Sequence, residues 1–401
     1  MEKIGFYAGS FDPFTKGHLA IVCEALCAFD EVVIGVGVNF SKKTLFTPSK
    51  RVALIESSID DFIRLYRHRQ LNRIVFSEGE QKAVLRLIDE PECLKIVSYE
   101  GLTIDAAIRN GANVLIRGER IVGDHDSEMA LAFVNRELLA IRKQHMDLVT
   151  LPVPDVRLTY ISSSAVKNLC SLGEYIAAQK YVMPSVHQTL MKKYLAERFV
   201  RYASSGREAL WSELCLAYSG DRFHHSLSHI AYCLNYVNIY ANVMSEKYDY
   251  ALSEDEKQGL SAAIFYHDYF CSGREDDEVR SAQKAQEDLQ ILGCNYPDVR
   301  PLIMMTQHSG NYVKVPLAYQ LIRDVDLAIL GDRDNYGLYA MHIRCEYSQY
   351  DTKTYALKRS EVLRQLLHSD CLYLTEFFRE AFQENAELNM KTELAYWENL
   401  F

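Results

Sequence analysis

The chain has 401 residues, a net charge of −10, 48% apolar residues and 24% charged residues. These values are typical of a soluble globular protein with two or three domains, and the acidic balance argues against nucleic acid as the main partner. With no signal peptide and no apolar run near the ~18 residues that span a bilayer, we expect a cytoplasmic protein without a membrane partner. The ten cysteines form no CxxC pair, which is typical of reduced thiols.

The first motif along the chain is YAGSFDPFTKGH, residues 7–18. An apolar run at residues 4–8 predicts a buried strand, which breaks at Gly9-Ser10 and is followed by a helix starting near His18. Backbone N–H groups and the helix dipole at such a turn bind phosphate, and His18 can donate a hydrogen bond to a phosphoryl oxygen. The alternative is a glycine turn that binds nothing, and the concentration of Ser, Thr, Lys and His favours the phosphate site.

The rest of the first half alternates strand and helix patterns. Strands are predicted at 31–38, 73–76, 113–117 and 148–151, and helices at 19–29, from Pro48 with Thr47 as N-cap, at 80–89, 104–109 and 126–143, and from Ser162–Ser164 to about residue 196. This alternation predicts an α/β fold with a doubly wound parallel sheet, Rossmann-like, whose ligands bind at the carboxyl ends of the strands.

A composition change follows residues 199–207, whose small polar residues indicate a linker. From residue 208 onward the patterns are helical, with almost no strand signal. The sequence therefore predicts two domains, an α/β domain at 1–198 and an all-α domain at 208–401.

Several cationic and hydroxyl residues fall at one edge of the predicted sheet. Lys42 and Lys43 follow the second strand, Arg117 and Arg120 follow the strand at 113–117, and Ser162–Ser164 cap a helix. Any one of them alone would be interpreted as a solvated surface group. Together they predict a triphosphate site, because such a ligand needs several cations and N–H donors that converge on its charge.

Five pieces of residues 1 to about 195 resemble, in order, the bacterial phosphopantetheine adenylyltransferases: YAGSFDPFTKGH, NFSKKTLFT with RVAL, VLIRGER, the helix with Glu128 and Asn135-Arg136, and YISSSAVK. The first piece alone would indicate only the nucleotidyltransferase superfamily. The resemblance implies transfer of the adenylyl group of ATP to 4′-phosphopantetheine, which gives dephospho-coenzyme A and pyrophosphate in coenzyme A biosynthesis. It implies direct in-line attack with no covalent enzyme intermediate.

The resemblance also implies residue roles. His18 stabilises the transition state, and the acceptor is held by Ser10, Lys42, Thr103 and Arg117. The ATP site is formed by Ser10, Phe11, His18, Gly118, Glu119, Arg120, Glu128, Leu158, Thr159, Tyr160, Ile161, Ser162, Ser163 and Ser164. Mg²⁺ accompanies ATP. The expected partners are ATP, 4′-phosphopantetheine, dephospho-coenzyme A and coenzyme A, and the family's hexamers lead us to expect a homo-oligomer.

The sequence departs from the family pattern at three places. A segment of roughly residues 60–100 is longer than the family's connection and lies near the pantetheine arm there. Ser127 stands where the family has an aromatic residue, and Glu119 where it has an apolar one. These departures leave open an alternative in which the adenylyl acceptor is another small phosphate compound.

The second half carries a series of histidine and aspartate motifs, RFHHSLSHI at 222–230, FYHD at 265–268, MMTQH at 304–308 and DVDLAILG at 324–331. Imidazole and carboxylate together are ligands of Mn, Fe, Ni or Zn. A lone helical histidine is more often a core or surface residue, but five of the chain's twelve histidines lie in these motifs. The helical pattern alone does not choose between Asp324 and Asp326.

These motifs resemble the HD superfamily of metal-dependent phosphohydrolases. The resemblance implies that His229, His267, Asp268 and Asp326 bind a divalent transition metal, and that His225, Glu278 and His308 face the ligands or the substrate. It implies metal-activated water that attacks a phosphate ester, and hence a bifunctional enzyme. The alternative is an HD domain that senses nucleotide without hydrolysing it.

Overall fold

The structure is a computed structural model that describes residues 2–38, 43–119, 137–200, 207–244, 247, 251–291, 298–307, 315–369 and 372–400. The chain forms two compact units. The first comprises Met1–Arg69 and Ile74–Thr189, and the second comprises Gln70–Arg73 and Leu190–Phe401. Among the described helices, not one combines the length and apolar character that a bilayer crossing requires.

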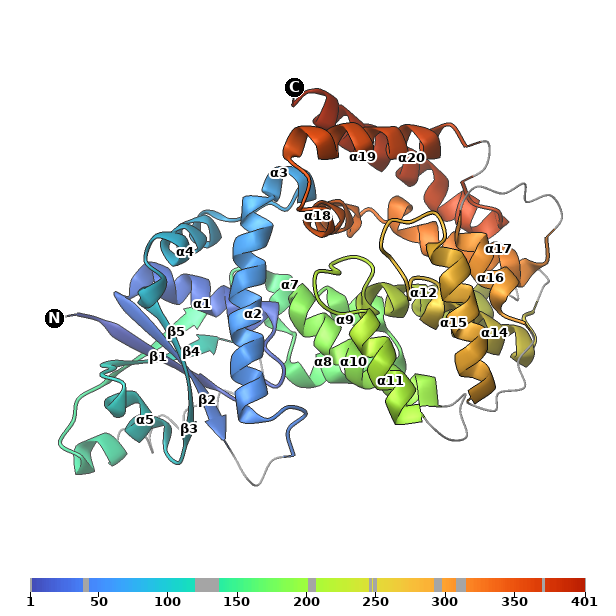
Figure 1. Ribbon diagram of the computed structural model, residues 1–401. Helices are drawn as coiled ribbons and strands as arrows, with labels where there is room; N and C mark the ends of the chain where they lie inside the picture. The colour runs from blue at the N-terminus through green and yellow to red at the C-terminus, as the bar shows by residue number, and fades with distance from the viewer. Residues whose placement is uncertain are drawn as a thin grey trace. The chain divides into compact units, whose positions relative to one another are not determined.

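The first unit is built on a five-stranded parallel sheet in the order β3-β2-β1-β4-β5 (Figure 1). Its strands are β1 (Ile4–Gly9), β2 (Glu31–Val38), β3 (Leu94–Glu100), β4 (Val114–Glu119) and β5 (Asp147–Pro152). Its helices are α1 (Lys16–Ala28), α2 (Pro48–Arg67), α4 (Glu78–Asp89), α5 (Thr103–Arg109), α7 (Val156–Thr159), α8 (Ser163–Leu172) and α9 (Tyr175–Gln179). The parallel sheet confirms the predicted Rossmann-like α/β class.

The central strand β1 sets the position of the loop that follows it. Phe6 of β1 is fully buried and lies in register with Val33 of β2 and Leu115 of β4. Ile104 of α5 packs in the same apolar cluster. Because parallel strands end at the same edge, the loops after β1 and β4 meet above this core.

The predicted strand at 73–76 is wrong. These residues connect α3 (Arg69–Asn72) to α4, Arg73 has a φ of 56°, and Val75 is 92% exposed. The strand of this region is β3, which pairs along its whole length with β2. Lys95 and Glu100 interrupt its apolar residues, as is typical of an edge strand, so it lacks the continuous apolar run of a central one.

The predicted helix starts are largely confirmed. Thr47 caps α2 by accepting a hydrogen bond from the Lys50 N–H (3.3 Å), with Pro48 at the first helical position. Most of the predicted helix at 126–143 lies outside the described residues, and its end is helical at 137–141.

Helix α4, inside the longer segment, is tied to the end of α1 by one side chain. The Arg86 guanidinium donates to the carbonyls of Leu26 (2.5 Å), Phe29 (2.6 Å) and Asp30. The last carbonyls of a helix have no partner within it, so the guanidinium replaces water there.

We expect Arg86→Ala to lower the free energy of unfolding by about 2–3 kcal/mol, because hydrogen bonds from a charged donor are lost. Urea denaturation measures this. Lys82→Ala on the same helix is the matched control, because the Lys82–Glu78 pair is exposed to solvent and should contribute little to the free energy of unfolding. Equal effects of the two substitutions would contradict this role of Arg86.

The regular elements of the second unit, within the described residues, are all helices. One of them is α3, most of which belongs to this unit. The others are the C-terminal part of α10 (Pro184–Val200), α11 (Arg207–Ala217), α12 (Leu227–Ile239), a π-helical turn (Tyr240–Met244), α14 (Glu254–Tyr266), α15 (Asp277–Ile291), α16 (Arg300–Met304), α17 (Leu317–Leu327), α18 (Tyr336–Glu346), α19 (Thr352–Leu367) and α20 (Glu376–Glu398). This agrees with the predicted all-α region.

The predicted linker starts too early. Phe199 belongs to α10, is buried, and packs against Trp211 (5.4 Å between ring centres) and Phe265 (5.3 Å). The compact units divide at Thr189–Leu190, within α10, whereas the sequence places the end of the first domain at residue 198. A continuous helix gives no composition signal at such a division.

Candidate functional sites

A cavity of about 590 Å³ lies at the carboxyl ends of β1 and β4. It is lined by the loop after β1, the start of α1, the start of α5 and the segment that leads into α8. The cavity brings together most of the predicted site residues, namely Ser10, Phe11, His18, Thr103, Arg117, Gly118, Leu158, Thr159, Ile161, Ser162, Ser163 and Ser164.

The other predicted residues of this site are not brought into the cavity by the described structure. Tyr160 is 67% exposed and is not among the lining residues. Glu119 is the last residue of β4. Lys42, Arg120 and Glu128 lie outside the described residues.

The start of α1 fixes the tautomer of His18. Thr15 is the N-cap, and its backbone N–H donates to His18 Nδ1 (3.0 Å). A neutral imidazole that accepts at Nδ1 carries its proton on Nε2. The His18 ring is buried between Phe11 (5.1 Å between ring centres) and Phe14 (5.5 Å), which restricts its rotation. His18 is therefore a preorganised hydrogen-bond donor at the cavity wall.

Phe11 serves mainly to shape this loop. It has a φ of 48° and is 1% exposed. A Cβ at Gly9 would lie 2.8 Å from the Phe11 ring, so only glycine permits this close approach. Phe11 lines the cavity, and its ring is at the same time packed in the core. Its role at the ATP site stays a prediction.

Asp12 connects the loop to two other segments, a role that the sequence analysis did not predict. Its carboxylate accepts hydrogen bonds from the N–H groups of Leu45 (2.7 Å) and Phe46 (3.0 Å) and from the Lys167 ammonium (3.1 Å). The segment directly after Lys42 is thereby held against the loop after β1.

Arg51 is a second supporting residue that sequence reasoning missed. Its guanidinium is buried and donates to the carbonyls of Ser10 (2.5 Å) and Gly37 (3.1 Å). Burial lowers the pKa of Arg51, and Asp12 partly offsets this. Arg51 is the first residue of the RVAL piece, so the sequence did point to it. It was passed over because an arginine in a helical pattern is ordinarily a surface residue.

The serine motif, Ser162–Ser164, forms another part of the cavity wall. Ser162 caps α8 by accepting from the Ala165 N–H (3.1 Å), and the Ser163 hydroxyl donates to the Pro13 carbonyl (2.8 Å). The first N–H groups of α8 therefore border the cavity beside the loop, which is an anion-binding arrangement.

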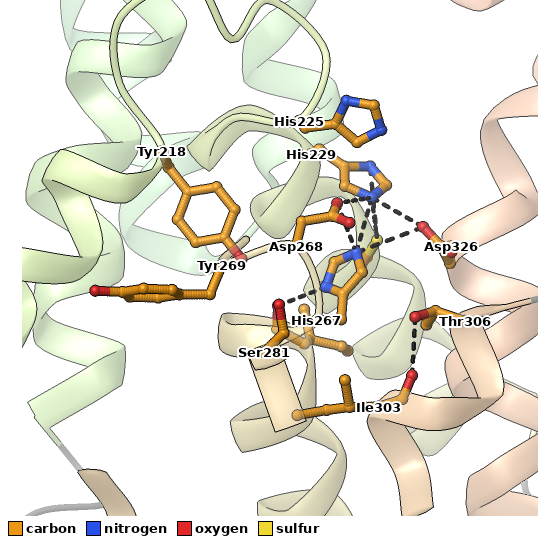
Figure 2. A network of polar contacts seen from close by, with 12 residues as sticks. Tyr218, His225, His229, His267, Asp268, Tyr269, Ser281, Ile303, Thr306 and Asp326 are labelled. Atoms are coloured by element: carbon orange, nitrogen blue, oxygen red, sulfur yellow. Dashed lines mark hydrogen bonds and ion pairs between the residues drawn. The ribbon is translucent and has the colours of Figure 1, made fainter. Parts of the chain in front are cut away.

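The second constellation lies in the helical unit, where His229, His267, Asp268 and Asp326 converge (Figure 2). One ligand atom from each lies within 4.8 Å of the others. The two histidine Nε2 atoms are 3.2 Å apart, His229 Nε2 is 3.0 Å from Asp326 Oδ1, and His267 Nε2 is 3.0 Å from Asp268 Oδ2.

These four residues fit a divalent transition metal. Ligands at about 2.1 Å from one ion lie roughly 3.0–3.4 Å from each other, close to the separations found. His267 Nδ1 lies 2.9 Å from the Ile264 carbonyl and must donate to it, which leaves the Nε2 lone pair facing the cluster. Asp268 Oδ2 is buried and accepts no hydrogen bond, because His267 Nε2, 3.0 Å away, presents a lone pair to it in this tautomer. A metal cation would accept electron pairs from both His267 Nε2 and Asp268 Oδ2.

Charge at the cluster also suits a cation. Burial alone would raise the pKa of the Asp268 carboxyl, but the positive charge of protonated His267 and His225 outweighs burial and holds the pKa below its ordinary value. Asp268 is thus ionised at neutral pH. A metal ion would take the place of the His267 proton at Nε2. Arg222 fixes this segment by donating to the carbonyls of Asp268 (2.7 Å) and Tyr269 (3.0 Å), a contact that sequence reasoning missed.

The structure separates the two aspartates that the sequence pattern left as alternatives. Asp326 faces the cluster. Asp324 is fully buried and accepts hydrogen bonds from the N–H groups of Leu374 (2.8 Å) and Thr375 (2.7 Å) and from the Thr375 hydroxyl (2.7 Å). Burial raises the pKa of Asp324 to about 6. Asp324 therefore holds Leu374 and Thr375, which directly precede α20, and Thr375 is the N-cap of that helix.

The remaining candidates lie outside the group of four. Glu278 is half-buried in the first turn of α15, and His308 falls outside the described residues. His225 is beside His229, with 6.4 Å between ring centres, and pairs with Glu346. Burial would lower the pKa of His225, but Glu346, Cys271 and Asp268 outweigh burial and raise the pKa well above its usual value.

Comparison with known proteins concerns the first half of the chain. A family model described as cytidylyltransferase-like matches residues 6–169. The phosphopantetheine adenylyltransferase of Porphyromonas gingivalis is 35% identical over 44% of this chain and 92% of that protein. The phosphopantetheine adenylyltransferase of Lachnoclostridium phytofermentans is 35% identical over 49% of this chain and 98% of that protein.

A solved structure of Plasmodium falciparum nicotinic acid mononucleotide adenylyltransferase complexed with NaAD covers 48% of this chain and 96% of its own. Its sequence identity is 16% and its TM-score is 0.26, too low to carry an argument. The two bacterial relatives are each matched over nearly their full length. Through its N-terminal half, the chain therefore belongs to the phosphopantetheine adenylyltransferase family, with a cytidylyltransferase-like nucleotidyltransferase domain.

Proposed function

We propose that the N-terminal half transfers the adenylyl group of ATP to 4′-phosphopantetheine, which gives dephospho-coenzyme A and pyrophosphate. The observation that carries this proposal is the convergence of His18, Thr103, Arg117 and the N-terminus of α8 on one cavity. The names of the bacterial relatives support the choice of acceptor.

The proposed reaction is a single displacement. A phosphate oxygen of 4′-phosphopantetheine attacks the α-phosphorus of ATP, the bond from that phosphorus to the bridging oxygen breaks, and pyrophosphate leaves with the electron pair. His18 Nε2–H donates to an α-phosphoryl oxygen, whose charge changes in the transition state. Arg117 neutralises the acceptor phosphate, and the first N–H groups of α8 bind the triphosphate. Mg²⁺ bound to ATP supplies further neutralisation.

The acceptor is tested by pyrophosphate release from ATP with the full chain. We expect release with 4′-phosphopantetheine and none above background with nicotinamide mononucleotide or glycerol phosphate. Release with another acceptor but not with 4′-phosphopantetheine would instead support the alternative, adenylyl transfer to a different small phosphate compound.

A second function is favoured by the cluster of four in the helical unit. We infer an HD-type metal-dependent phosphohydrolase in which His229, His267, Asp268 and Asp326 hold a divalent transition metal such as Mn, Fe, Ni or Zn. When bound, such an ion lowers the pKa of a water and neutralises a phosphoryl group. The buried imidazoles supply neutral nitrogen ligands, and the two carboxylates reduce the net charge of the ion.

This second function has a non-hydrolytic alternative, a metal-bound nucleotide sensor. The full chain with Mn²⁺ is incubated with bis-p-nitrophenyl phosphate, p-nitrophenyl phosphate and a panel of nucleotides. Product release that depends on Mn²⁺ supports the hydrolase. Nucleotide binding by calorimetry without product release from any of these esters supports the sensor.

A further inference from the structure

Two hydroxyl groups lie together at the wall of the cavity in the α/β unit. Tyr99 is in β3, Thr103 is the first residue of α5, and both line the cavity. Tyr99 Oη lies 2.8 Å from Thr103 Oγ1, and neither hydroxyl has another hydrogen-bond partner among the described residues. This hydrogen bond uses one of the two hydroxyl protons, so one O–H remains to donate to a ligand.

The neighbouring strand β2 holds the Tyr99 ring in place. Tyr99 is in register with Gly37 of β2, and Gly35 lies two residues earlier on the same face of that strand. A Cβ at Gly35 would lie 3.0 Å from the Tyr99 ring, and a Cβ at Gly37 would lie 3.3 Å from the Tyr99 hydroxyl oxygen. The ring also packs edge-on against Phe6, with 5.7 Å between ring centres. The two glycines therefore leave room for the ring across β2, which fixes the position of its hydroxyl.

The cavity wall beside this hydroxyl pair is uncharged. Among the lining residues that the structure describes, the side chains able to carry positive charge are His18 and Arg117. Gly101 and Leu102, next to the pair, are uncharged, and Leu102 is 46% exposed. Arg117 is in β4, and β2 and β4 flank β1 (Figure 1), so these two strands are about 10 Å apart. A ligand whose phosphate is bound by Arg117 can therefore extend an uncharged arm toward the pair.

We propose that the Tyr99–Thr103 pair binds an amide carbonyl in the uncharged arm of the acceptor, and that Tyr99 is a positioning residue that orients the Thr103 hydroxyl. The proposal rests on adenylyl transfer to 4′-phosphopantetheine, whose arm contains two amide groups. The family resemblance implies that Thr103 contacts the acceptor, whereas the role of Tyr99 and the amide carbonyl as the bound group come from the geometry of the pair.

The acidity of the two hydroxyls determines which of them faces the ligand. A phenol is a far stronger acid than an aliphatic alcohol, so Tyr99 donates to Thr103 Oγ1. The Thr103 O–H then remains to donate to the carbonyl oxygen. Burial raises the pKa of Tyr99, so its hydroxyl keeps the proton at neutral pH. A donor that is itself hydrogen-bonded in this way is both oriented and polarised.

A purely structural hydroxyl pair makes a different prediction. If Tyr99 only joined β3 to α5, Tyr99→Phe would lower the unfolding midpoint and leave the KM for the acceptor unchanged. If Tyr99 orients Thr103, Tyr99→Phe keeps the ring over the two glycines but should raise the KM for 4′-phosphopantetheine about three- to tenfold, the loss expected for one hydrogen bond between neutral groups. The kcat and the KM for ATP should not change, because only binding of the acceptor is weakened.

The test is steady-state pyrophosphate release by the full chain, with 4′-phosphopantetheine and ATP varied in turn and the unfolding midpoint measured in parallel. Thr103→Val should raise the KM for 4′-phosphopantetheine by about tenfold or more, because the carbonyl loses its donor. Thr103→Ser keeps the hydroxyl and should recover most of this loss. The double variant should be no worse than Thr103→Val, since Tyr99 acts through Thr103. Tyr66→Phe is the control, because Tyr66 is in α2 and is not among the lining residues.

Two outcomes would overturn the proposal. An unchanged KM for 4′-phosphopantetheine in the Tyr99→Phe chain removes the positioning role, and effects that add in the double variant would mean that Tyr99 acts independently of Thr103. The wild-type chain distinguishes these failures from that of the proposed function. No pyrophosphate release with 4′-phosphopantetheine contradicts both proposals, whereas release that neither Tyr99→Phe nor Thr103→Val alters contradicts the amide subsite alone.

Discussion

His18→Ala is expected to lower the rate of adenylyl transfer by about 10²–10³-fold, the loss observed when one preorganised donor to a transition state is removed. The affinity for ATP should change little, because the substitution leaves the proposed contact of the triphosphate with the N-terminus of α8 in place. The physical basis is the bond from the Thr15 N–H to His18 Nδ1, which leaves the proton on Nε2 before substrate arrives. Steady-state rates and ATP titration by calorimetry measure the two quantities separately.

The matched control is His145→Ala, because the His145 side chain is 90% exposed. It should retain full activity. A His18→Ala chain with strongly weakened ATP binding and a nearly normal maximal rate would contradict the transition-state role and make His18 a ground-state contact.

Asp268→Asn has the largest expected effect in the helical unit. The substitution keeps the side chain's shape but removes the negative charge beside His267, so metal affinity should fall by more than about 100-fold, the upper range for merely supporting residues. Elemental analysis after dialysis against Mn²⁺ measures the amount of Mn²⁺ bound per chain. The wild-type unfolding temperature should rise with added Mn²⁺, and that of the variant should not.

Asp276→Asn provides the comparison, because Asp276 pairs with Arg274 and both side chains are largely exposed. Metal content in this control should equal that of the wild type. If Asp268→Asn retained the same Mn²⁺ content and the same stabilisation, the four converging side chains would be a hydrogen-bonded group of the core and not a metal centre.

The first half shows how far the sequence predicts the fold. The strands β1, β2 and β4 were evident because buried parallel strands carry continuous apolar runs. The edge strand β5 is more exposed but has a short β-branched and apolar run at residues 148–151. β3 was missed, and a strand was wrongly predicted at 73–76, because an edge strand with alternating charges has a weaker signal than a short β-branched run. Ile74 and Val75 of that run are exposed, and only the pairing of strands in the folded sheet distinguishes such a run from a true strand.

At the candidate sites, too, the sequence predicts what has a local motif and misses what depends on tertiary contacts. Most residues that line the cavity and the four that converge in the helical unit were predicted from their motifs, whereas the residues that hold the surrounding loops were not. Asp12, Arg51 and Glu346 act through hydrogen bonds to distant backbone groups, and the Glu346–His225 pair spans 121 positions. Nothing local in the sequence distinguishes such a carboxylate or guanidinium from a solvated one.

The central claim is that the N-terminal half adenylylates 4′-phosphopantetheine. The most direct measurement incubates the purified full chain with ATP, Mg²⁺ and 4′-phosphopantetheine and follows both products, pyrophosphate by a coupled assay and the adenylylated product by mass spectrometry. We expect pyrophosphate and dephospho-coenzyme A in equal amounts, with both formed about 10²–10³-fold more slowly by the His18→Ala chain. ATP consumption without dephospho-coenzyme A, or no pyrophosphate at all, would contradict the claim.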